Sequence, residues 1–475
     1  MRRAAIVGAG PNGLSAAITL ARAGVAVTVF EAEAMVGGAA RTAELTLPGF
    51  RHDVGSSVYP MGVASPFFRG LPLERFGLRW IEPSAALAHP LDDGSAVMLE
   101  HDVEATAAGL GVDAAAWRRL MAPLAEGWRD LSAEVLGPVV HVPRHPLLLG
   151  RFGLFAAMPA TALAKMLFRG ERARALFAGC AAHSVKPLES VASAAIGLVL
   201  AVAGQALKQG GGWPVVEGGA QKLSDALAAY LVSLGGEIRT GARISDLREV
   251  GEVDAVLCDV SPRQLLKIAG EWLLPEYAAK MKRFEYGPGV FKVDWALSQR
   301  IPWKARECGR AATVHVGGTM EEVAASERAP EHGGIAARPF VLVTQPSLFD
   351  ASRAPAGKHT AWGYCHVPNG WQGSALEAME AQMERFAPGF RECVLARHVM
   401  GPQALEVWDA NLVGGDISGG AMTLRQMVAR PTASLYRTGA KGLYLCSAST
   451  PPGGGVHGMC GHTAALWALR DMGKA

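Results

Sequence analysis

Short apolar runs and amphipathic segments alternate at both ends of this chain. Near the amino-terminus, residues 4–7 predict a buried strand, residues 14–23 a helix, and residues 25–30 a second, β-branched strand. Near the carboxyl end, residues 443–446 predict another strand and residues 462–470 another helix. Strand, helix and strand in succession are typical of α/β proteins with a parallel sheet.

The middle of the chain has two different patterns. A helix with Leu223, Leu227 and Leu231 on one face is followed by residues 237–247, which are expected to form strand, turn and strand. Four runs are alternating or rich in β-branched and aromatic residues, as sheet strands are: 289–297, 312–316, 339–345 and 359–367. Helices are expected over residues 117–136, 191–207 and 374–387.

The turn between the first strand and the first helix contains Gly8, Gly10, Pro11, Asn12 and Gly13, which gives the pattern G-x-G-x-x-G. In such a turn the glycines permit a tight bend, close approach of a pyrophosphate and close packing of helix on strand. The free N–H groups at the start of the helix favour the phosphates. Glu31 ends the second strand at a spacing suited to binding a ribose hydroxyl. We therefore predict a dinucleotide site.

Three further segments have a common resemblance. Gly37 and Gly38 follow Glu31, "GFRHDVGSSVYP" covers residues 49–60, and "GLYLCSASTPPGGGVHGMCGHTAALWAL" covers residues 442–469. Together with the glycine turn, they resemble the FAD-binding segments of the phytoene desaturase and amine oxidase superfamily. The resemblance extends over nearly the whole chain and is closest to the phytoene dehydrogenase-like branch, which includes the pyridine nucleotide-disulfide oxidoreductase domain proteins.

The resemblance implies an α/β fold, with a Rossmann-type FAD-binding domain and an inserted substrate domain made of a mixed sheet and helices. The FAD-binding domain is expected to be discontinuous, and its pieces are residues 1–65, 211–285 and 405–475. Residues 66–210 and 286–404 are expected to form the substrate domain. The first of these two pieces is expected to be mainly helical.

The resemblance also implies which residues contact FAD: Gly8, Gly10, Pro11, Asn12, Gly13, Glu31, Ala32, Gly38, Ala39, Arg41, Gly55, Ser56, Ile244, Ser447, Gly454, Gly455 and Val456. Ile244 would offer main-chain hydrogen bonds to the adenine. In many family members an arginine directly follows the glycine pair and reaches a phosphate. Here Ala39 and Ala40 intervene before Arg41, which departs from that pattern.

We expect an FAD-dependent oxidoreductase that desaturates or dehydrogenates a hydrophobic substrate, isoprenoid, carotenoid-like or long-chain, by hydride transfer to flavin N5. No second G-x-G-x-x-G is present, so oxygen, a quinone or another acceptor is expected to take the electrons. Three alternatives stay open: a flavin-dependent isomerase or saturase of a polyene, an amine oxidase, and a non-catalytic lipid or prenyl carrier of the same fold. Candidate catalytic groups are His457, Asp416 and Tyr59, with His183 and His366 as weaker candidates.

The composition of the chain excludes some classes of partner and some kinds of chemistry. The net charge of +3, from 46 basic and 43 acidic residues, argues against nucleic acid as a partner. The seven cysteines form no C-x-x-C pair, so neither disulfide reductase chemistry nor a metal site is expected, and a reducing, cytoplasmic location fits.

Residues 144–174 combine Leu, Phe and Met with a basic excess that includes Arg169, Arg172 and Arg174. Residues 144–207 are therefore expected to form either a helical roof over the substrate cavity or a peripheral membrane contact.

Overall fold

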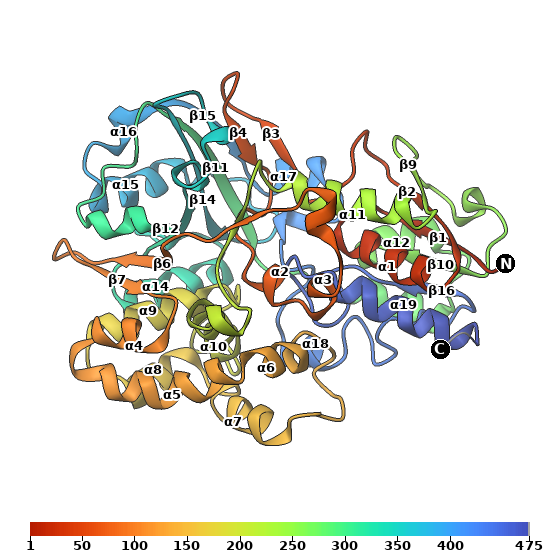
Figure 1. The fold of residues 1–475 in the computed structure, drawn as a ribbon, viewed down its shortest axis with the longest axis horizontal. Coiled ribbons are helices and arrows are strands. Elements are labelled where there is room, and N and C mark those ends of the chain that lie inside the picture. Colours follow the sequence, from red (N-terminus) through yellow and green to blue (C-terminus); the bar gives the residue numbers. More distant parts are fainter. Residues whose placement is uncertain (474–475) are drawn as a thin grey trace.

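The structure is a computed structural model, which describes residues 1–473 and contains two large sheets (Figure 1). The first is a five-stranded, fully parallel sheet with the order β16-β10-β1-β2-β9. Its strands are β1 (Arg3–Val7), β2 (Ala26–Phe30), β9 (Glu237–Arg239), β10 (Ala255–Cys258) and β16 (Leu443–Leu445). Three segments that are far apart in the sequence therefore build one sheet of the Rossmann type, as predicted.

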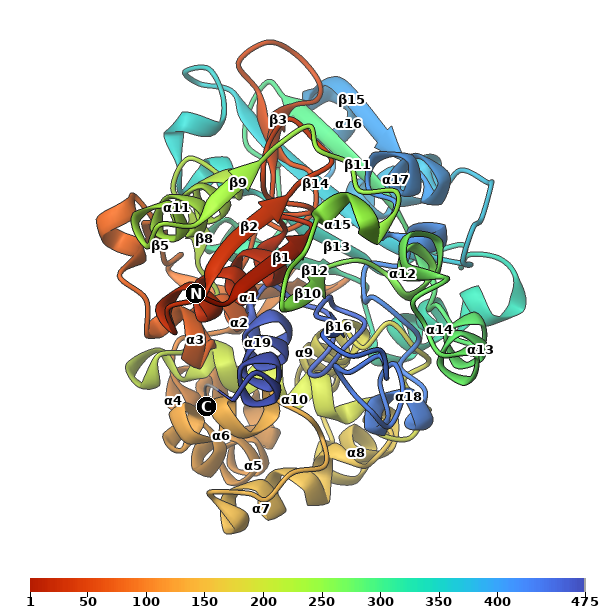
Figure 2. The same ribbon diagram turned by 90° about the vertical axis from the view of Figure 1, so that its right-hand side faces the viewer.

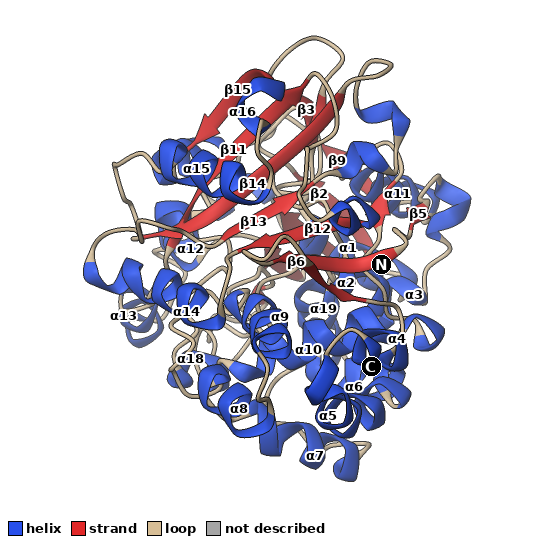
Figure 3. Ribbon diagram, turned by 90° about the vertical axis from the view of Figure 1, so that its left-hand side faces the viewer, coloured by secondary structure: helices blue, strands red, loops and turns tan. Residues whose placement is uncertain are grey.

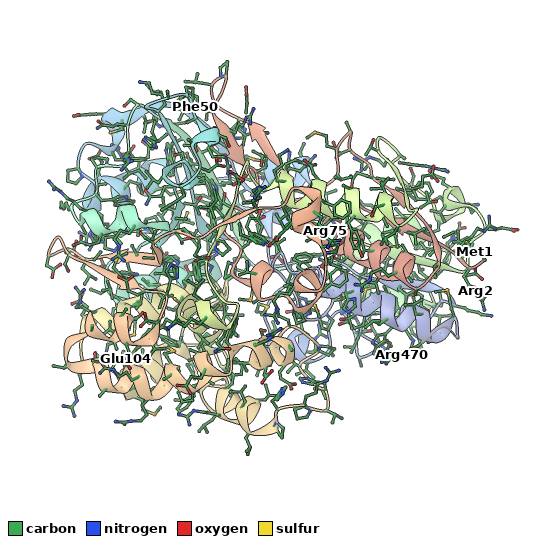
Figure 4. The ribbon with its side chains drawn as sticks, viewed as in Figure 1. Met1, Arg2, Phe50, Arg75, Glu104 and Arg470 are labelled. Carbon is green, nitrogen blue, oxygen red and sulfur yellow. The ribbon has the colours of Figure 1, made fainter. Side chains whose placement is uncertain are left out.

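Helices α1 (Pro11–Arg22), α11 (Gln221–Ser233) and α19 (Met459–Asp471) gather beside this sheet (Figure 2). Helix α1 begins with Pro11, whose ring suits the first helical position. Helix α19 approaches α1 closely because residue 461 is glycine: a Cβ there would lie 1.8 Å from the Asn12 carbonyl oxygen. Both chain ends lie at this end of the molecule, where Figure 4 shows Met1, Arg2 and Arg470 near one another.

The second sheet is mixed and has seven strands in the order β15-β11-β14-β13-β12-β6-β7. Only β6 and β12 pair in parallel. Its strands are β6 (Ala85–Pro90), β7 (Ala96–Leu99), β11 (Gly289–Leu297), β12 (Ala311–Val316), β13 (Val341–Thr344), β14 (His359–Val367) and β15 (Val394–Met400). All four predicted strands of this region are present.

Residues 66–210 are mainly helical, as expected, but they also contain β6 and β7, which we did not predict and which extend the mixed sheet from β12. Strand β15 was not predicted either. The strand, turn and strand expected over residues 237–247 need correction. Within residues 237–247 only β9 forms: Gly241 and Ala242 instead donate hydrogen bonds to the carbonyl oxygens of Glu33 and Glu31, so this backbone runs as a loop across the end of β2.

A layer of helices covers one side of the mixed sheet (Figure 3). It consists of α4 (Val103–Ala108), α5 (Ala114–Glu126), α6 (Trp128–Val135), α7 (Pro146–Ala156), α8 (Ala160–Leu167), α9 (Glu171–Ala182) and α10 (Ala194–Gln205). Trp117, Trp128 and Leu198 are among its fully buried core residues. Within residues 1–473 no single helix has the length and apolar character to cross a bilayer; α7 and α8, bent by 98° at their break, pass that test only as a pair.

Shorter elements connect these layers. The helices are α2 (Pro60–Ala64), α3 (Pro66–Arg69), α12 (Pro262–Ala269), α13 (Pro275–Lys282), α14 (Met320–Arg328), α15 (Leu376–Phe386), α16 (Phe390–Cys393), α17 (Pro402–Trp408) and α18 (Leu424–Val428). The strands β3 (Thr42–Glu44) and β4 (Arg51–Asp53) form one small hairpin-like sheet, and β5 (Trp80–Ile81) pairs with β8 (Val215–Val216).

The buried carboxylate of Asp53 joins the parts of the molecule at the end of β4. It accepts hydrogen bonds from the hydroxyls of Thr42 and Ser57 and from the backbone N–H of Ala220 at the start of α11. The guanidinium of Arg353, which is also completely buried, lies 2.8 Å from the same carboxylate. Because Arg353 lies between β13 and β14 of the mixed sheet, this ion pair connects the small β3–β4 sheet to the mixed sheet.

Candidate active site

A cavity of about 730 Å³ is lined by residues from both sheets and from the helical layer. Sixteen of the seventeen residues predicted to contact FAD line it: Gly8, Gly10, Pro11, Asn12, Glu31, Ala32, Gly38, Ala39, Arg41, Gly55, Ser56, Ile244, Ser447, Gly454, Gly455 and Val456. Gly13 is not among the lining residues. The fold therefore brings segments more than four hundred residues apart to one site, and the individual contacts with FAD stay predictions.

The glycine turn has the geometry needed for a phosphate site. Gly8 has a φ of +102°, and a Cβ there would lie 2.8 Å from the Asp259 carbonyl oxygen. A Cβ at Gly13 would lie 2.1 Å from the Gly8 carbonyl oxygen, so Gly13 is the position at which helix and strand pack. Gly10 faces the cavity with no side chain to fill it. The shape of this turn, as well as its sequence, therefore fits a bound pyrophosphate.

Glu31, the residue predicted to bind the ribose of FAD, lies in the cavity wall. This residue is only 8% exposed, and its carboxylate accepts backbone hydrogen bonds from Ala9 (2.7 Å) and Glu33 (3.0 Å). These bonds hold the carboxylate at the cavity wall. The loop after β9 runs alongside and brings Ile244 to the same end of the cavity. The nearby Arg41 donates to the Gly38 carbonyl, and its guanidinium lies 4.3 Å from the centre of the Trp408 ring.

The three candidate catalytic groups also line the cavity. His457 is buried and accepts a hydrogen bond at Nδ1 from the Met459 backbone N–H, so its ring proton is on Nε2, which has no hydrogen-bond partner within residues 1–473. Burial lowers the pKa of His457 to about 4, so the ring is neutral at pH 7 and only a weak base. Its catalytic role stays a prediction.

The other two candidates are more fully engaged. The Asp416 carboxylate accepts hydrogen bonds from the backbone N–H groups of Gly287 and Ser418, and burial raises its pKa. The Tyr59 hydroxyl donates to the Ser56 carbonyl, and burial raises its pKa above the ordinary value. Both arrangements hold loops around the cavity, so catalytic roles for Asp416 and Tyr59 stay predictions that the local bonding does not favour.

The two weaker histidine candidates are placed differently. His183 lines the cavity, with its Nε2 3.0 Å from Nε2 of His315. His366 does not line it, and its Nδ1 lies 2.7 Å from a carboxylate oxygen of Glu327.

A family model described as flavin containing amine oxidoreductase matches residues 12–370. The chain belongs to this family. Pyridine nucleotide-disulfide oxidoreductase domain-containing protein 2 of Rattus norvegicus is 27% identical over 548 aligned positions, which cover 99% of this chain and 93% of the relative. Phytoene dehydrogenase of Streptomyces griseus is 28% identical over 426 positions, covering 82% of this chain and 77% of the relative.

Among solved structures, wild-type putrescine oxidase bound to putrescine matches with a TM-score of 0.62 at 18% identity, over 99% of this chain and 98% of that one. This likeness confirms the FAD-binding α/β fold. Family membership confirms FAD as the cofactor and places the protein among the flavin-containing oxidoreductases.

The mixed sheet contributes cavity residues that we did not predict. Lys292 on β11 and Trp362 and Tyr364 on β14 line the cavity, and the Lys292 ammonium lies 4.8 Å from the centre of the Trp362 ring. Lys292 forms a buried ion pair with Asp294. Burial lowers the pKa of Lys292. Burial alone would raise the pKa of Asp294, but Lys292 and His398 outweigh it and lower that pKa. The sequence did contain a signal for this pair, because Lys292 and Asp294 are the two charged residues in the otherwise largely apolar run 289–297.

Asp259 at the end of β10 is a second residue that we did not predict. Its carboxylate accepts the Gly13 backbone N–H at 2.7 Å, at the turn where a pyrophosphate would bind. Burial, with contributions from Asp409 and Glu31, raises the pKa of Asp259 to about 7. If the pyrophosphate binds at this turn as predicted, it would lie beside an acid that ionises near neutral pH.

We predict that FAD binds more weakly as the pH rises through 7. The negative pyrophosphate would raise the pKa of Asp259 further, so binding favours the protonated acid and takes up a proton. The dissociation constant of FAD, measured by flavin fluorescence, should increase by up to about fivefold from pH 7 to pH 8. Asp259→Asn should bind FAD with little dependence on pH, whereas an equal slope in that variant would contradict the role of Asp259.

Proposed function

We propose that this protein is an FAD-dependent dehydrogenase or desaturase of a largely apolar substrate. The observation that carries the proposal is the continuity of the cavity: beyond the FAD-binding residues, the same space is lined by apolar side chains of the helical layer. They are Val135, Leu136, Ile196, Val199 and Leu200. The similarity to phytoene dehydrogenase of Streptomyces griseus supports the same substrate class.

FAD, when bound, would accept two electrons from a substrate C–H bond. The chain's own part is to hold the substrate in a dry space and to supply hydrogen bonds at fixed atoms. His457 presents Nε2–H to the cavity, and Lys292 presents an ammonium whose charge is balanced by Asp294. At pH 7 His457 is a neutral and weak base, and the Lys292 ammonium is paired with Asp294, so neither suits proton abstraction from an acidic carbon. Loss of a hydride to FAD would leave a carbocation, whose adjacent proton a weak base suffices to accept.

The amine oxidase alternative is favoured by the fold of putrescine oxidase and by the stacked Trp362 and Tyr364, whose ring centres are 5.9 Å apart. An amine substrate would place its ammonium against these aromatic faces. Here the Lys292 ammonium already occupies the Trp362 face, so a second cation would be repelled. A carrier role is disfavoured by the complete glycine turn with Glu31.

The test is anaerobic reduction of the bound flavin by a candidate substrate. Reduction is monitored as the loss of flavin absorbance. The purified protein is expected to be yellow with non-covalent FAD, and a polyisoprenoid supplied in detergent should reduce it, whereas putrescine should not. Reduction by putrescine alone would replace the proposal by the amine oxidase function. A colourless protein that takes up no FAD would leave the carrier function. Reoxidation by oxygen or by a quinone then identifies the class of electron acceptor.

We also propose that the substrate enters from a membrane surface at α7, which forms the lower edge of the molecule in Figures 1 and 3. Leu147 and Leu154 of this helix are 90% and 69% exposed, and Val142 just before it is 91% exposed. Arg144, Arg151, Lys165 and Arg169 of the same segment are exposed as well, although Arg151 also donates a hydrogen bond to the Arg119 carbonyl and Lys165 lies 3.9 Å from Glu321. Arg172 and Arg174 instead donate hydrogen bonds to backbone carbonyls within the protein, so they are not free for lipid headgroups.

Replacing Leu147 and Leu154 by serine should weaken binding to phosphatidylglycerol vesicles at least about tenfold, because each buried leucine contributes roughly 1.5–3 kcal/mol. Binding is measured by vesicle sedimentation at low and high salt. Val232→Ser, at an exposed apolar position on α11, is the matched control and should bind like the wild type. Unchanged binding of the double variant would show that α7 is only a wall of the fold.

A further inference from the structure

Two threonines on the mixed sheet present unpaired hydroxyls to the cavity. Thr313 on β12 and Thr344 on β13 are direct cross-strand neighbours, and both line the cavity. They are 1% and 2% exposed, and neither Oγ1 has a hydrogen-bond partner among the described residues. Ser184, in the loop between α9 and α10, adds a third buried, unpartnered hydroxyl to the lining.

Two neighbouring buried hydroxyls without hydrogen-bond partners are unusual in a protein core. Side chains directly opposite on antiparallel strands are about 5 Å apart at Cβ, close enough for one ligand atom to contact both hydroxyls. A buried hydroxyl without a partner is costly, and valine has the same shape without that cost. The next residue in this cross-strand row is Trp362, whose indole N–H donates to the Ser57 hydroxyl and is not available.

The part of the cavity beside Thr313 and Thr344 carries no net charge. Burial lowers the pKa of His183 to about 3, and His315 behind it is lowered further by burial and by His183, so both rings are uncharged at pH 7. The nearest cation on the same sheet face, Lys292, is balanced by Asp294. A carboxylate bound here would lose its hydration with no free positive charge to replace it.

We infer that the substrate carries a neutral oxygen group, such as a hydroxyl, ketone or ester, which binds between the hydroxyls of Thr313 and Thr344 while its apolar body lies against α10. This inference rests on the proposed function, since it names the polar end of the same apolar substrate. We therefore expect an oxygen-bearing substrate rather than a plain hydrocarbon, because a hydrocarbon would leave both threonine hydroxyls unpaired.

The test compares three probes of equal chain length, octane, octan-1-ol and octanoate, by equilibrium dialysis of the labelled compounds against the FAD-loaded protein. Octan-1-ol should bind the wild type more tightly than octanoate. In the double variant Thr313→Val/Thr344→Val, octan-1-ol affinity should fall about tenfold, because two hydrogen bonds are lost, while octane affinity stays within about twofold.

Thr360→Val is the matched control. Thr360 lies on β14 and is equally buried with an unpartnered hydroxyl, but it does not line the cavity. It should leave all three affinities unchanged. If the double valine variant does not fold, the single variants Thr313→Val and Thr344→Val should each lower octan-1-ol affinity by about threefold.

Three results would overturn the inference: equal loss of octane and octan-1-ol binding, the same effect from Thr360→Val, or octanoate binding as tightly as the alcohol. The flavin content of each sample separates this failure from that of the proposed function. A yellow protein with no preference for the alcohol retains the oxidoreductase function without a polar subsite.

Discussion

Gly13→Ala is expected to weaken FAD binding on the order of 100-fold. The added Cβ would lie 2.1 Å from the Gly8 carbonyl oxygen and 3.2 Å from the Asp259 Cβ. The first of these contacts is with backbone, so helix α1 and strand β1 would have to separate at the turn that is to hold the pyrophosphate. Overpacking of this kind costs about 1–3 kcal/mol, and 3 kcal/mol weakens binding on the order of 100-fold.

The measurement is the ratio of bound flavin to protein after reconstitution with excess FAD. Gly150→Ala is the control, because a Cβ at Gly150 on α7 would meet nothing within 4 Å. That variant should carry wild-type FAD and be slightly more stable, since alanine is favoured over glycine inside a helix. Full flavin content in Gly13→Ala would show that the turn rearranges without cost or that the phosphates bind elsewhere.

Asp53→Ala is expected to be the most destabilising single change among those considered. It would leave the buried Arg353 guanidinium without a counter-charge, and removal of one partner from a buried ion pair costs about 3–5 kcal/mol. The hydroxyls of Thr42 and Ser57 and the Ala220 N–H would also lose their acceptor. Because Ser57 in turn receives the Trp362 indole N–H, the cavity wall should loosen as well.

Thermal unfolding of the FAD-loaded protein measures this effect, and a large drop in Tm with faster release of FAD is expected. Glu104→Ala is the matched control. Glu104, at the surface of α4 (Figure 4), pairs with Arg118 at 2.6 Å, but both side chains are exposed. Such pairs contribute about 0–1 kcal/mol. Equal losses of stability in the two variants would contradict the role assigned to the buried pair.

Local chemistry explains what was predictable in the fold. The glycine turn was recognisable because a φ of +102° at Gly8 and close backbone approach at Gly13 restrict the residue type at these positions. Glu31 was recognisable because it ends the second strand at a fixed spacing from the turn. The four strands of residues 289–367 were recognisable because their pattern is periodic or rich in β-branched residues. Strands β6 and β7 were missed since short strands at the far edge of a sheet are defined by their neighbour β12, more than two hundred residues away.

The site divides in the same way. The predicted FAD-contact set followed from the glycine turn, from Glu31 and from the resemblance of further segments to a flavoprotein superfamily, and all its members except Gly13 line one cavity. Asp259, Lys292 and the Thr313–Thr344 pair are in no motif, and their importance comes from burial and from partners on other strands. Residues 144–174 show the opposite case, in which a sequence pattern suggested a role that the structure does not support for every residue. Arg172 and Arg174 look like membrane contacts in the sequence, but they donate hydrogen bonds to carbonyls inside the protein.

The sequence by itself therefore determined the cofactor class and the elements that carry it, because a tight turn, a helix start and a strand-end carboxylate are local arrangements. The tertiary structure alone decided which groups face the substrate and how they are charged. Burial removes water from Asp259, His183 and Lys292 and thereby changes their pKa values, and burial is a property of the whole fold. Cross-strand pairing, set by register between distant segments, placed two hydroxyls side by side in the cavity.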